Sequence, residues 1–200
     1  AIATHALSIF GDHSDVMLCR GIGFAELASS SVQEVMDLGC VAQLATIKSR
    51  VPFIHFFDGF RTSHEIQKIE VMDEDFLKEQ IDMDAVKAFR ERGLNPEHPV
   101  VKGTNQNPDI FFQQREGSNK YYEDVVGITE HYMEAVSKQT GRDYKLFNYY
   151  GAEDAENIVI AMGSVCEALE EVVDYLNAKG EKVGLLKIRL YRPFSTKHFL

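Results

Sequence analysis

The residues best suited to chemistry stand together in one short loop. Residues 58–65 read Asp-Gly-Phe-Arg-Thr-Ser-His-Glu and combine acids, an arginine, hydroxyls and a histidine. They follow residues 51–57, an apolar run that we expect as a buried strand, and ligands collect at the carboxyl ends of strands in open parallel sheets. We therefore expect the loop to line an active site or a subunit contact, with four candidate pocket residues, Asp58, Arg61, Ser63 and His64. A helix could instead begin at His64, with Thr62 or Ser63 as its cap, and that capping is compatible with a role in the pocket.

A second polar loop, Gly-Asp-His-Ser-Asp at residues 11–15, has a similar character. His13 could shuttle protons near neutral pH, or it could form a hydrogen bond with Asp12 or Asp15. Two carboxylates and an imidazole are ligand types that metals use, but their spacing matches no strong metal-binding pattern. We favour a structural role for this loop and keep Asp12 and His13 as candidate pocket residues.

Glycine turns suggest two further possibilities. Gly21-Ile22-Gly23 and Gly163-Ser164 complete neither a dinucleotide fingerprint nor a P-loop. Gly163 precedes a predicted helix, whose N-terminus could hold an anion. The simpler interpretation, which we favour, is that Gly163 turns the chain and that Ser164 and Glu167 form a capping box.

The periodicity of apolar residues predicts an α/β fold. A capping box at residues 31–34 starts a helix that ends near residue 49, before the strand at 51–57. A strand at 157–163, a helix at 164–179 and a strand at 182–190 form a right-handed βαβ unit. A turn-rich stretch after residue 150 places a domain boundary there and divides the chain into residues 1–150 and 151–200.

The middle of the chain is more polar. Residues 73–92 predict one amphipathic helix or two short ones, and residues 121–140 predict a helix that ends at Gly141. Between them, residues 93–120 hold three of the five prolines and predict a long irregular arm. Residues 6–10 and 21–27 suggest shorter strand or loop pieces.

Composition excludes several classes of function. The 200 residues carry 21 basic and 31 acidic side chains, a net charge of −10 that disfavours nucleic-acid binding. No apolar run approaches the roughly 20 residues of a membrane span. The three cysteines are isolated, so this stretch alone is expected to hold neither a zinc ribbon nor an iron–sulfur cluster. Reduced cysteines favour a cytosolic compartment. Because the chain begins at Ala1, we expect an N-terminal part of a longer protein to precede it.

Several runs of residues resemble pyruvate:ferredoxin (or flavodoxin) oxidoreductases, and the resemblance extends over nearly the whole chain. The most specific run is PFIHFFDGFRTSHEIQKIE at residues 52–70. Small departures, such as Cys19 and Gly21, do not weaken it. The other matching runs are HALSIFGDHSDVM (5–17), LASSSVQE (27–34), NPEHP (95–99), QNPDI (106–110) and KIRLYRPF (187–194).

The resemblance implies a parallel-sheet, thiamine-diphosphate-binding type of fold. Residues 1–150 would be the later part of the pyrimidine-binding domain, and residues 151–200 would begin a transketolase C-terminal-like α/β domain. Such enzymes oxidatively decarboxylate pyruvate with coenzyme A to acetyl-CoA and CO2. They use thiamine diphosphate, Mg2+ and [4Fe–4S] clusters, and they reduce ferredoxin or flavodoxin. A homodimer in the cytoplasm, or in an anaerobic organelle of a eukaryote, is also implied.

The family's best-attested catalytic residues find no counterpart in this sequence. Its substrate-binding threonine motif, its pyrimidine-binding glutamate and its pyruvate-binding arginine all fall outside residues 1–200. We therefore expect the 200 residues alone to hold no cofactor and to be inactive. Two alternatives remain open: the substrate could be another 2-oxoacid such as 2-oxoglutarate, or the segment could serve only structure and subunit contacts.

Overall fold

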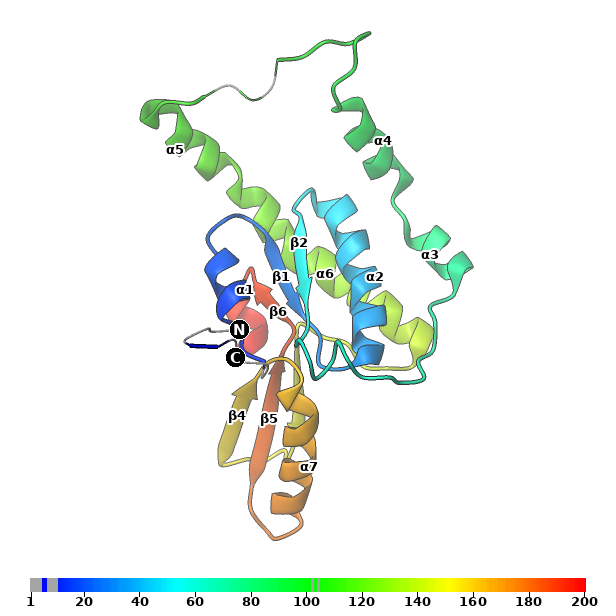
Figure 1. Cartoon of the computed structure of the whole chain (residues 1–200), viewed down its shortest axis with the longest axis vertical. Helices are drawn as coiled ribbons and strands as arrows, with labels where there is room; N and C mark the ends of the chain where they lie inside the picture. The colour runs from blue at the N-terminus through cyan, green and yellow to red at the C-terminus, as the bar shows by residue number, and fades with distance from the viewer. Residues whose placement is uncertain (1–4, 7–10, 102, 104) are drawn as a thin grey trace.

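The computed structural model describes residues 5, 6, 11–101, 103 and 105–200. Two small sheets carry the architecture: one in the middle of the molecule, flanked by long helices, and a second below it (Figure 1). An arm extends from the opposite end of the central body (Figure 1). The α/β fold class predicted from the sequence is confirmed.

The first sheet has the strand order β2-β1-β6. Strand β1 (Ala25–Ala28) runs parallel to β2 (Phe53–Phe56), and β6 (Leu190–Arg192) adds an antiparallel partner to β1. The sheet is therefore mixed rather than purely parallel, because the chain returns to it from the second sheet. The residues predicted as strand and helix at 31–57 fold as expected, with α2 (Val32–Ser49) connecting β1 to β2.

The start of α2 confirms one half of the predicted capping box, the cap by Ser31. Ser31 Oγ accepts a hydrogen bond from the backbone N–H of Glu34 at 3.3 Å. The Glu34 carboxylate accepts one in return from the Ser30 N–H at 2.7 Å. The first bond satisfies an amide donor that the first helical turn leaves free. The second reaches the amide of Ser30, one residue before the N-cap, and not the N-cap amide that a capping box would use.

The main core lies between α2 and α6 (Asn119–Thr140), which pack against each other beside the first sheet. Leu38 and Val41 of α2 meet Met133 and Val136 of α6, and none of the four is exposed to solvent. The predicted end of α6 is confirmed, because Gly141 has a φ of 74° and closes the helix in the left-handed conformation.

The second sheet has the order β3-β5-β4. Strand β4 (Asn157–Ala161), helix α7 (Val165–Asn177) and strand β5 (Val183–Ile188) form the predicted unit with parallel strands. Strand β3 (Phe147–Gly151) pairs antiparallel with β5, so the expected boundary at residue 150 falls inside a strand of this sheet.

The arm contains more helix than the sequence suggested. Helices α3 (Glu74–Gln80) and α4 (Met83–Glu91) are the two short helices that were one of the predicted options, capped by Asp73 and Asp82. Helix α5 (Pro108–Gly117) overturns the expectation of irregular chain to residue 120. Pro108 stands at the first helical turn, where its missing N–H costs nothing, so this proline begins a helix.

One local prediction near the polar loops was wrong, and two short helices were not predicted. No helix begins at His64: residues 59–64 form turns, in which Phe60 has a φ of 63° and donates its N–H to Ser63 Oγ. A short helix, α1 (Ser14–Cys19), instead follows His13, and another, α8 (Thr196–Phe199), stands near the C-terminus. The piece predicted at residues 6–10 lies, except for Ala6, outside the described residues. Within the described part of the chain, no helix is long and apolar enough to cross a membrane.

Candidate functional site

Asp58 forms the centre of a junction between three segments that are distant in the sequence. It stands two residues after the end of β2 and is only 8% exposed. One carboxylate oxygen, Oδ1, lies 3.1 Å from His13 Nε2. The other, Oδ2, accepts a hydrogen bond of 2.5 Å from the backbone N–H of Ser164, at the start of α7. The carboxylate therefore ties the first sheet to the loop before α1 and to the second sheet.

Two glycines make room for this junction. A Cβ atom on Gly163 would lie 2.6 Å from Asp58 Oδ2 and 2.9 Å from His13 Nε2, and the φ of Gly163 is 84°. A Cβ atom on Gly11 would lie 3.0 Å from Asp58 Oδ1. Real Cβ atoms essentially never approach other heavy atoms closer than 3.0 Å. A side chain at position 163 would displace the carboxylate or the imidazole.

The electrostatics favour a charged pair. The hydrogen bond from His13 lowers the pKa of Asp58 to about 2, helped by the Ser164 N–H and opposed by burial. The hydrogen bond to Asp58 raises the pKa of His13 above its usual 6.5, although burial acts in the opposite direction. Nearby Asp12 and Asp15 raise it further. At neutral pH the junction is thus expected to hold an imidazolium next to a carboxylate.

The start of α7 differs from the capping box that the sequence predicted. Ser164 makes no side-chain cap bond, so that prediction was wrong. The alternative, an anion at the helix N-terminus, is realised within the chain itself, because the Asp58 carboxylate lies against the Ser164 N–H. The sequence predicted that Asp58 lines a pocket. It did not predict the contact with Ser164, because the two residues are 106 positions apart.

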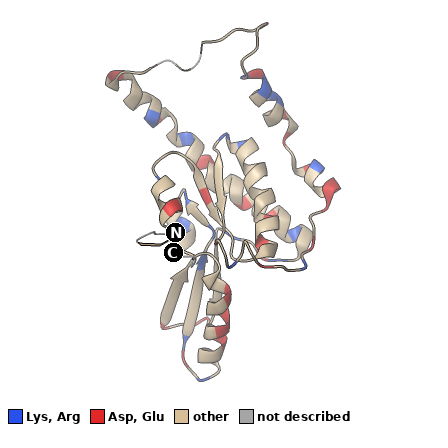
Figure 2. Ribbon diagram, in the orientation of Figure 1, with Lys and Arg blue, Asp and Glu red and all other residues tan. Residues whose placement is uncertain are grey.

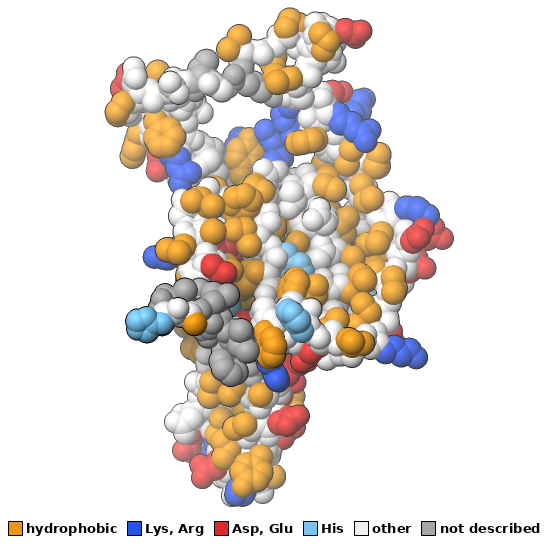
Figure 3. Space-filling model, viewed as in Figure 1, with side chains coloured by type: hydrophobic (Ala, Val, Ile, Leu, Met, Phe, Trp, Pro, Cys, Tyr) orange, Lys and Arg blue, Asp and Glu red, His pale blue; other side chains and the backbone are white. Residues whose placement is uncertain are grey.

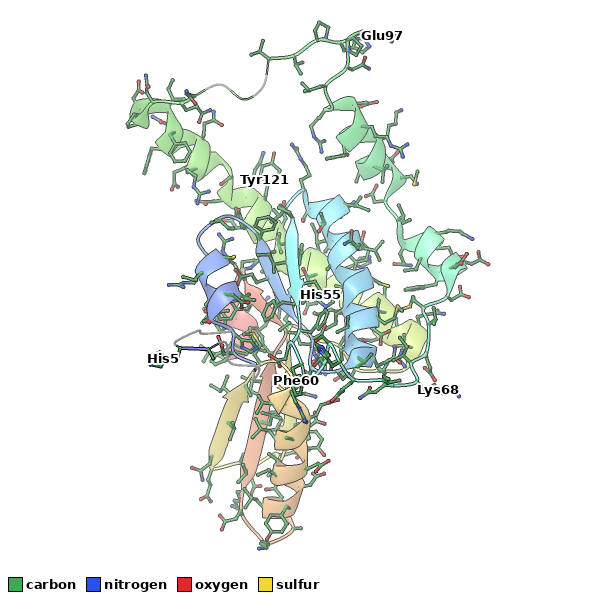
Figure 4. The ribbon with its side chains drawn as sticks, in the orientation of Figure 1. His5, His55, Phe60, Lys68, Glu97 and Tyr121 are labelled. Atoms are coloured by element: carbon green, nitrogen blue, oxygen red, sulfur yellow. The ribbon has the colours of Figure 1, made fainter. Side chains whose placement is uncertain are left out.

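The remaining predicted site residues lie near the junction in sequence but not within it. Asp12 accepts a hydrogen bond of 2.8 Å from the Ser14 N–H and so supports the start of α1. Ser63 Oγ lies 2.9 Å from His64 Nδ1, and both side chains are exposed. The Arg61 side chain is exposed as well. The structure therefore brings together Asp58 and His13. Arg61, Ser63 and His64 lie on the surface of the loop that follows β2. Figure 4 labels Phe60 of this loop, near the meeting point of the two sheets.

Two buried polar contacts near the junction were missed. Ser29 Oγ lies 2.7 Å from His55 Nε2, and burial lowers the pKa of His55 to about 4, so this imidazole is neutral. Arg189, only 3% exposed, donates to Glu34 Oε2 at 2.6 Å and to Asn148 Oδ1 at 2.8 Å. The one sign of the Arg189 contact in the sequence was the presence of a charged residue within an apolar strand segment.

The described residues do not by themselves fit thiamine diphosphate with its metal ion. Among them, no group of three or more His, Cys, Asp or Glu side chains is arranged to hold a metal. The helix N-terminus that the sequence marks as a possible anion site, that of α7, already faces Asp58. A diphosphate there would meet a carboxylate with a pKa of about 2, which is charged at neutral pH.

Comparison with known proteins identifies the family. A model described as "Pyruvate flavodoxin/ferredoxin oxidoreductase, thiamine diP-bdg" matches residues 1–134. The chain belongs to the pyruvate flavodoxin/ferredoxin oxidoreductase family. A second model of this family, "Pyruvate:ferredoxin oxidoreductase core domain II", matches residues 155–199. The resemblance noted in the sequence is thereby confirmed.

Relatives from this family cover the entire chain. It is 62% identical over 200 residues to the pyruvate:ferredoxin oxidoreductase of Moorella thermoacetica, and 62% identical over 199 residues to the pyruvate-flavodoxin oxidoreductase of Enterobacter agglomerans. All of this chain is covered in both comparisons, but only 17% of each relative. A solved 2-oxoglutarate:ferredoxin oxidoreductase from Magnetococcus marinus, with 2-oxoglutarate, coenzyme A and succinyl-CoA bound, matches 99% of this chain and 37% of its own. Its TM-score is 0.57 at 16% identity, which supports the fold alone.

Proposed function

We propose that these 200 residues form part of a pyruvate:ferredoxin or pyruvate:flavodoxin oxidoreductase. Such an enzyme would oxidatively decarboxylate pyruvate with coenzyme A to acetyl-CoA and CO2 and pass the electrons to ferredoxin or flavodoxin. The observation that carries the proposal is the 62% identity, over the full 200 residues, to a pyruvate:ferredoxin oxidoreductase. The alternative substrate 2-oxoglutarate has support only from a neighbour of 16% identity.

Within that enzyme, we assign this segment to scaffold and pocket wall. Residues 1–150 would belong to the thiamine-binding domain and residues 151–200 to the next domain, a division supported by the two separate family models. The Asp58 junction would fix the angle between them, since it joins the end of β2 to the start of α7. Asp12, His13, Arg61, Ser63 and His64 would line the surface beside that junction.

The cofactors would be held mainly by residues outside this segment. Thiamine diphosphate, when bound, supplies the carbanion and electron-sink chemistry, and Mg2+ and [4Fe–4S] clusters complete the set that the proposed reaction needs. We expect the 200 residues alone to bind none of these and to show no turnover, because one segment cannot preorganise a site spread over several domains. A homodimer and a cytoplasmic location complete the proposal, the latter supported by three free cysteines.

The test is an oxygen-free assay of the full-length polypeptide for viologen reduction driven by pyruvate and coenzyme A. Reduction with pyruvate and not with 2-oxoglutarate would support the proposed function. Reduction with 2-oxoglutarate alone would keep the class of reaction and refute the substrate. A preparation that contains its clusters and thiamine diphosphate but reduces viologen with neither substrate would refute the proposal.

A further inference from the structure

An apolar groove lies where the arm leaves the body. Its volume is about 880 Å³, and its walls come from the end of α2 with the residues that follow it, and from α4. Ile47 and Pro52 line the side of the body, and Phe89 lines the side of the arm. Phe89 is 71% exposed, although burial of an aromatic side chain of this size is strongly favourable. The groove is therefore shaped to receive apolar side chains.

The groove is also basic, in contrast to the rest of the chain. Three arginines line it, Arg50, Arg90 and Arg92, and no acidic residue does, whereas the whole chain carries a net charge of −10. Figure 2 shows acidic side chains spread along α7 and over the body, whereas α4 carries both basic and acidic ones. In Figure 3, basic and hydrophobic side chains gather around the opening between the arm and the body.

Two of these arginines are available to an anionic partner in different ways. Arg50 donates to the Tyr121 hydroxyl at 3.3 Å and stacks on the Tyr121 ring at 5.0 Å, so its guanidinium is held in place with donors remaining. Arg90 is exposed and forms no ion pair with any described residue. Guanidinium groups beside apolar side chains recognise carboxylates next to aliphatic or aromatic residues.

We propose that this groove binds an acidic amphipathic segment of the same polypeptide, from outside residues 1–200. The inference rests on the proposed function, because the relatives that carry it are much longer: this chain covers 17% of them. The segment would place an aliphatic or aromatic side chain against Phe89 and a carboxylate near Arg90.

The size of the groove favours a segment of the same polypeptide over a separate protein. Stable interfaces between separate proteins bury about 1,200–2,000 Å² and use about 20–30 residues on each side. Nine residues line this groove. A segment tethered in the same polypeptide binds at an effective concentration in the millimolar range, where such a small contact suffices.

Photo-crosslinking of the full-length polypeptide tests the proposal. Phe89 is replaced by p-benzoylphenylalanine, the sample is irradiated, and the products are separated on a denaturing gel and identified by mass spectrometry. We expect a product of unchanged mass that joins position 89 to a segment rich in Asp and Glu. In the same background, Arg90→Glu should lower the yield about fivefold or more. Lys87→Glu, a charge reversal on α4 outside the groove, should leave the yield nearly unchanged.

Three outcomes would overturn the proposal: a product of twice the chain mass, which indicates a second copy; a joined segment without acidic residues; or a yield no higher than with p-benzoylphenylalanine at the fully exposed Ile66. Pyruvate-driven viologen reduction by the same preparations tests the proposed function separately. An active enzyme without the crosslink refutes the docking alone. The expected crosslink in an inactive but loaded enzyme supports the docking and refutes the function.

Discussion

Replacement of Asp58 by Asn is the most direct test of the junction between the two sheets. The change keeps the shape of the side chain but removes its charge, which pairs with His13 and lies against the N-terminus of α7. The side chain is 8% exposed, so water cannot replace the interactions that the variant loses. We expect α7 to separate from the junction more often in the variant.

The magnitude follows from the pKa of Asp58. Its fall from 3.8 to about 2 would correspond to roughly 2.5 kcal/mol, because a tenfold change in an acid constant is worth about 1.4 kcal/mol. His13 is 25% exposed, so solvent reaches the junction and screens part of this energy. We therefore expect a loss of about 1–2 kcal/mol.

Hydrogen exchange of the full-length polypeptide measures this loss locally. Amides at residues 163–167 should exchange about 5–30 times faster in the Asp58→Asn variant. Asp109→Asn, a matched change at an exposed position of α5, should leave their exchange unaltered. Protection within twofold of the wild type in the Asp58 variant would refute the idea that this carboxylate fixes α7.

The pH dependence provides a second check with a definite sign. The folded pKa of Asp58 is lowered, so its contribution is present above about pH 4 and is lost as the pH falls toward 2. The folded pKa of His13 is raised, so its contribution is complete below pH 6.5 and is lost as the pH rises through its folded value. The difference between wild type and variant should be largest between about pH 4 and 6.5, once intrinsic exchange rates are corrected for pH. A difference that grows above pH 8 would contradict this assignment.

Three further predictions concern single positions. Gly163→Ala should destabilise the junction by about 1–3 kcal/mol, because the new Cβ would clash with Asp58, and amides at the start of α7 should exchange faster. The control Gly117→Ala has open space around it and should be neutral or slightly stabilising. Arg189→Met should lower the free energy of unfolding by about 3 kcal/mol, because Glu34 would remain half-buried without its cation. The amides at the N-terminus of α2 should then exchange faster, and unchanged protection there would contradict this role of Arg189. Because burial lowers the pKa of His55 to about 4, lowering the pH from 6.5 to 4 should destabilise the wild type more than a His55→Gln variant in thermal melts, and equal losses would show that this imidazole is not kept neutral.

Local sequence patterns predicted the regular elements well. The Ser31 cap, the apolar periodicity of α2 and the end of α6 at Gly141 depend on neighbours within a few residues. The βαβ unit was predictable because each of its three elements has a clear pattern of its own. The start of α5 was missed because its proline was taken to break a helix, although at the first turn a proline starts one.

The candidate site was only half predictable. The polar loop after β2 identified Asp58, and the polar loop at residues 11–15 identified His13. No local pattern linked either residue to Ser164, which lies 106 residues beyond Asp58. That contact depends on how the second sheet packs on the first. The same is true of Arg189, whose partner Glu34 lies 155 residues away along the chain.

The passage from β5 into β6 has a consequence for recombining these proteins. The chain pairs with the second sheet up to Ile188 and, from Leu190, with β1 of the first sheet. An exchange of the second unit between relatives, cut at residue 150, would therefore also replace an edge strand of the first sheet. A hybrid with a mismatched β6 would lose part of the central sheet, so viable crossovers are expected to keep β1 and β6 from the same parent.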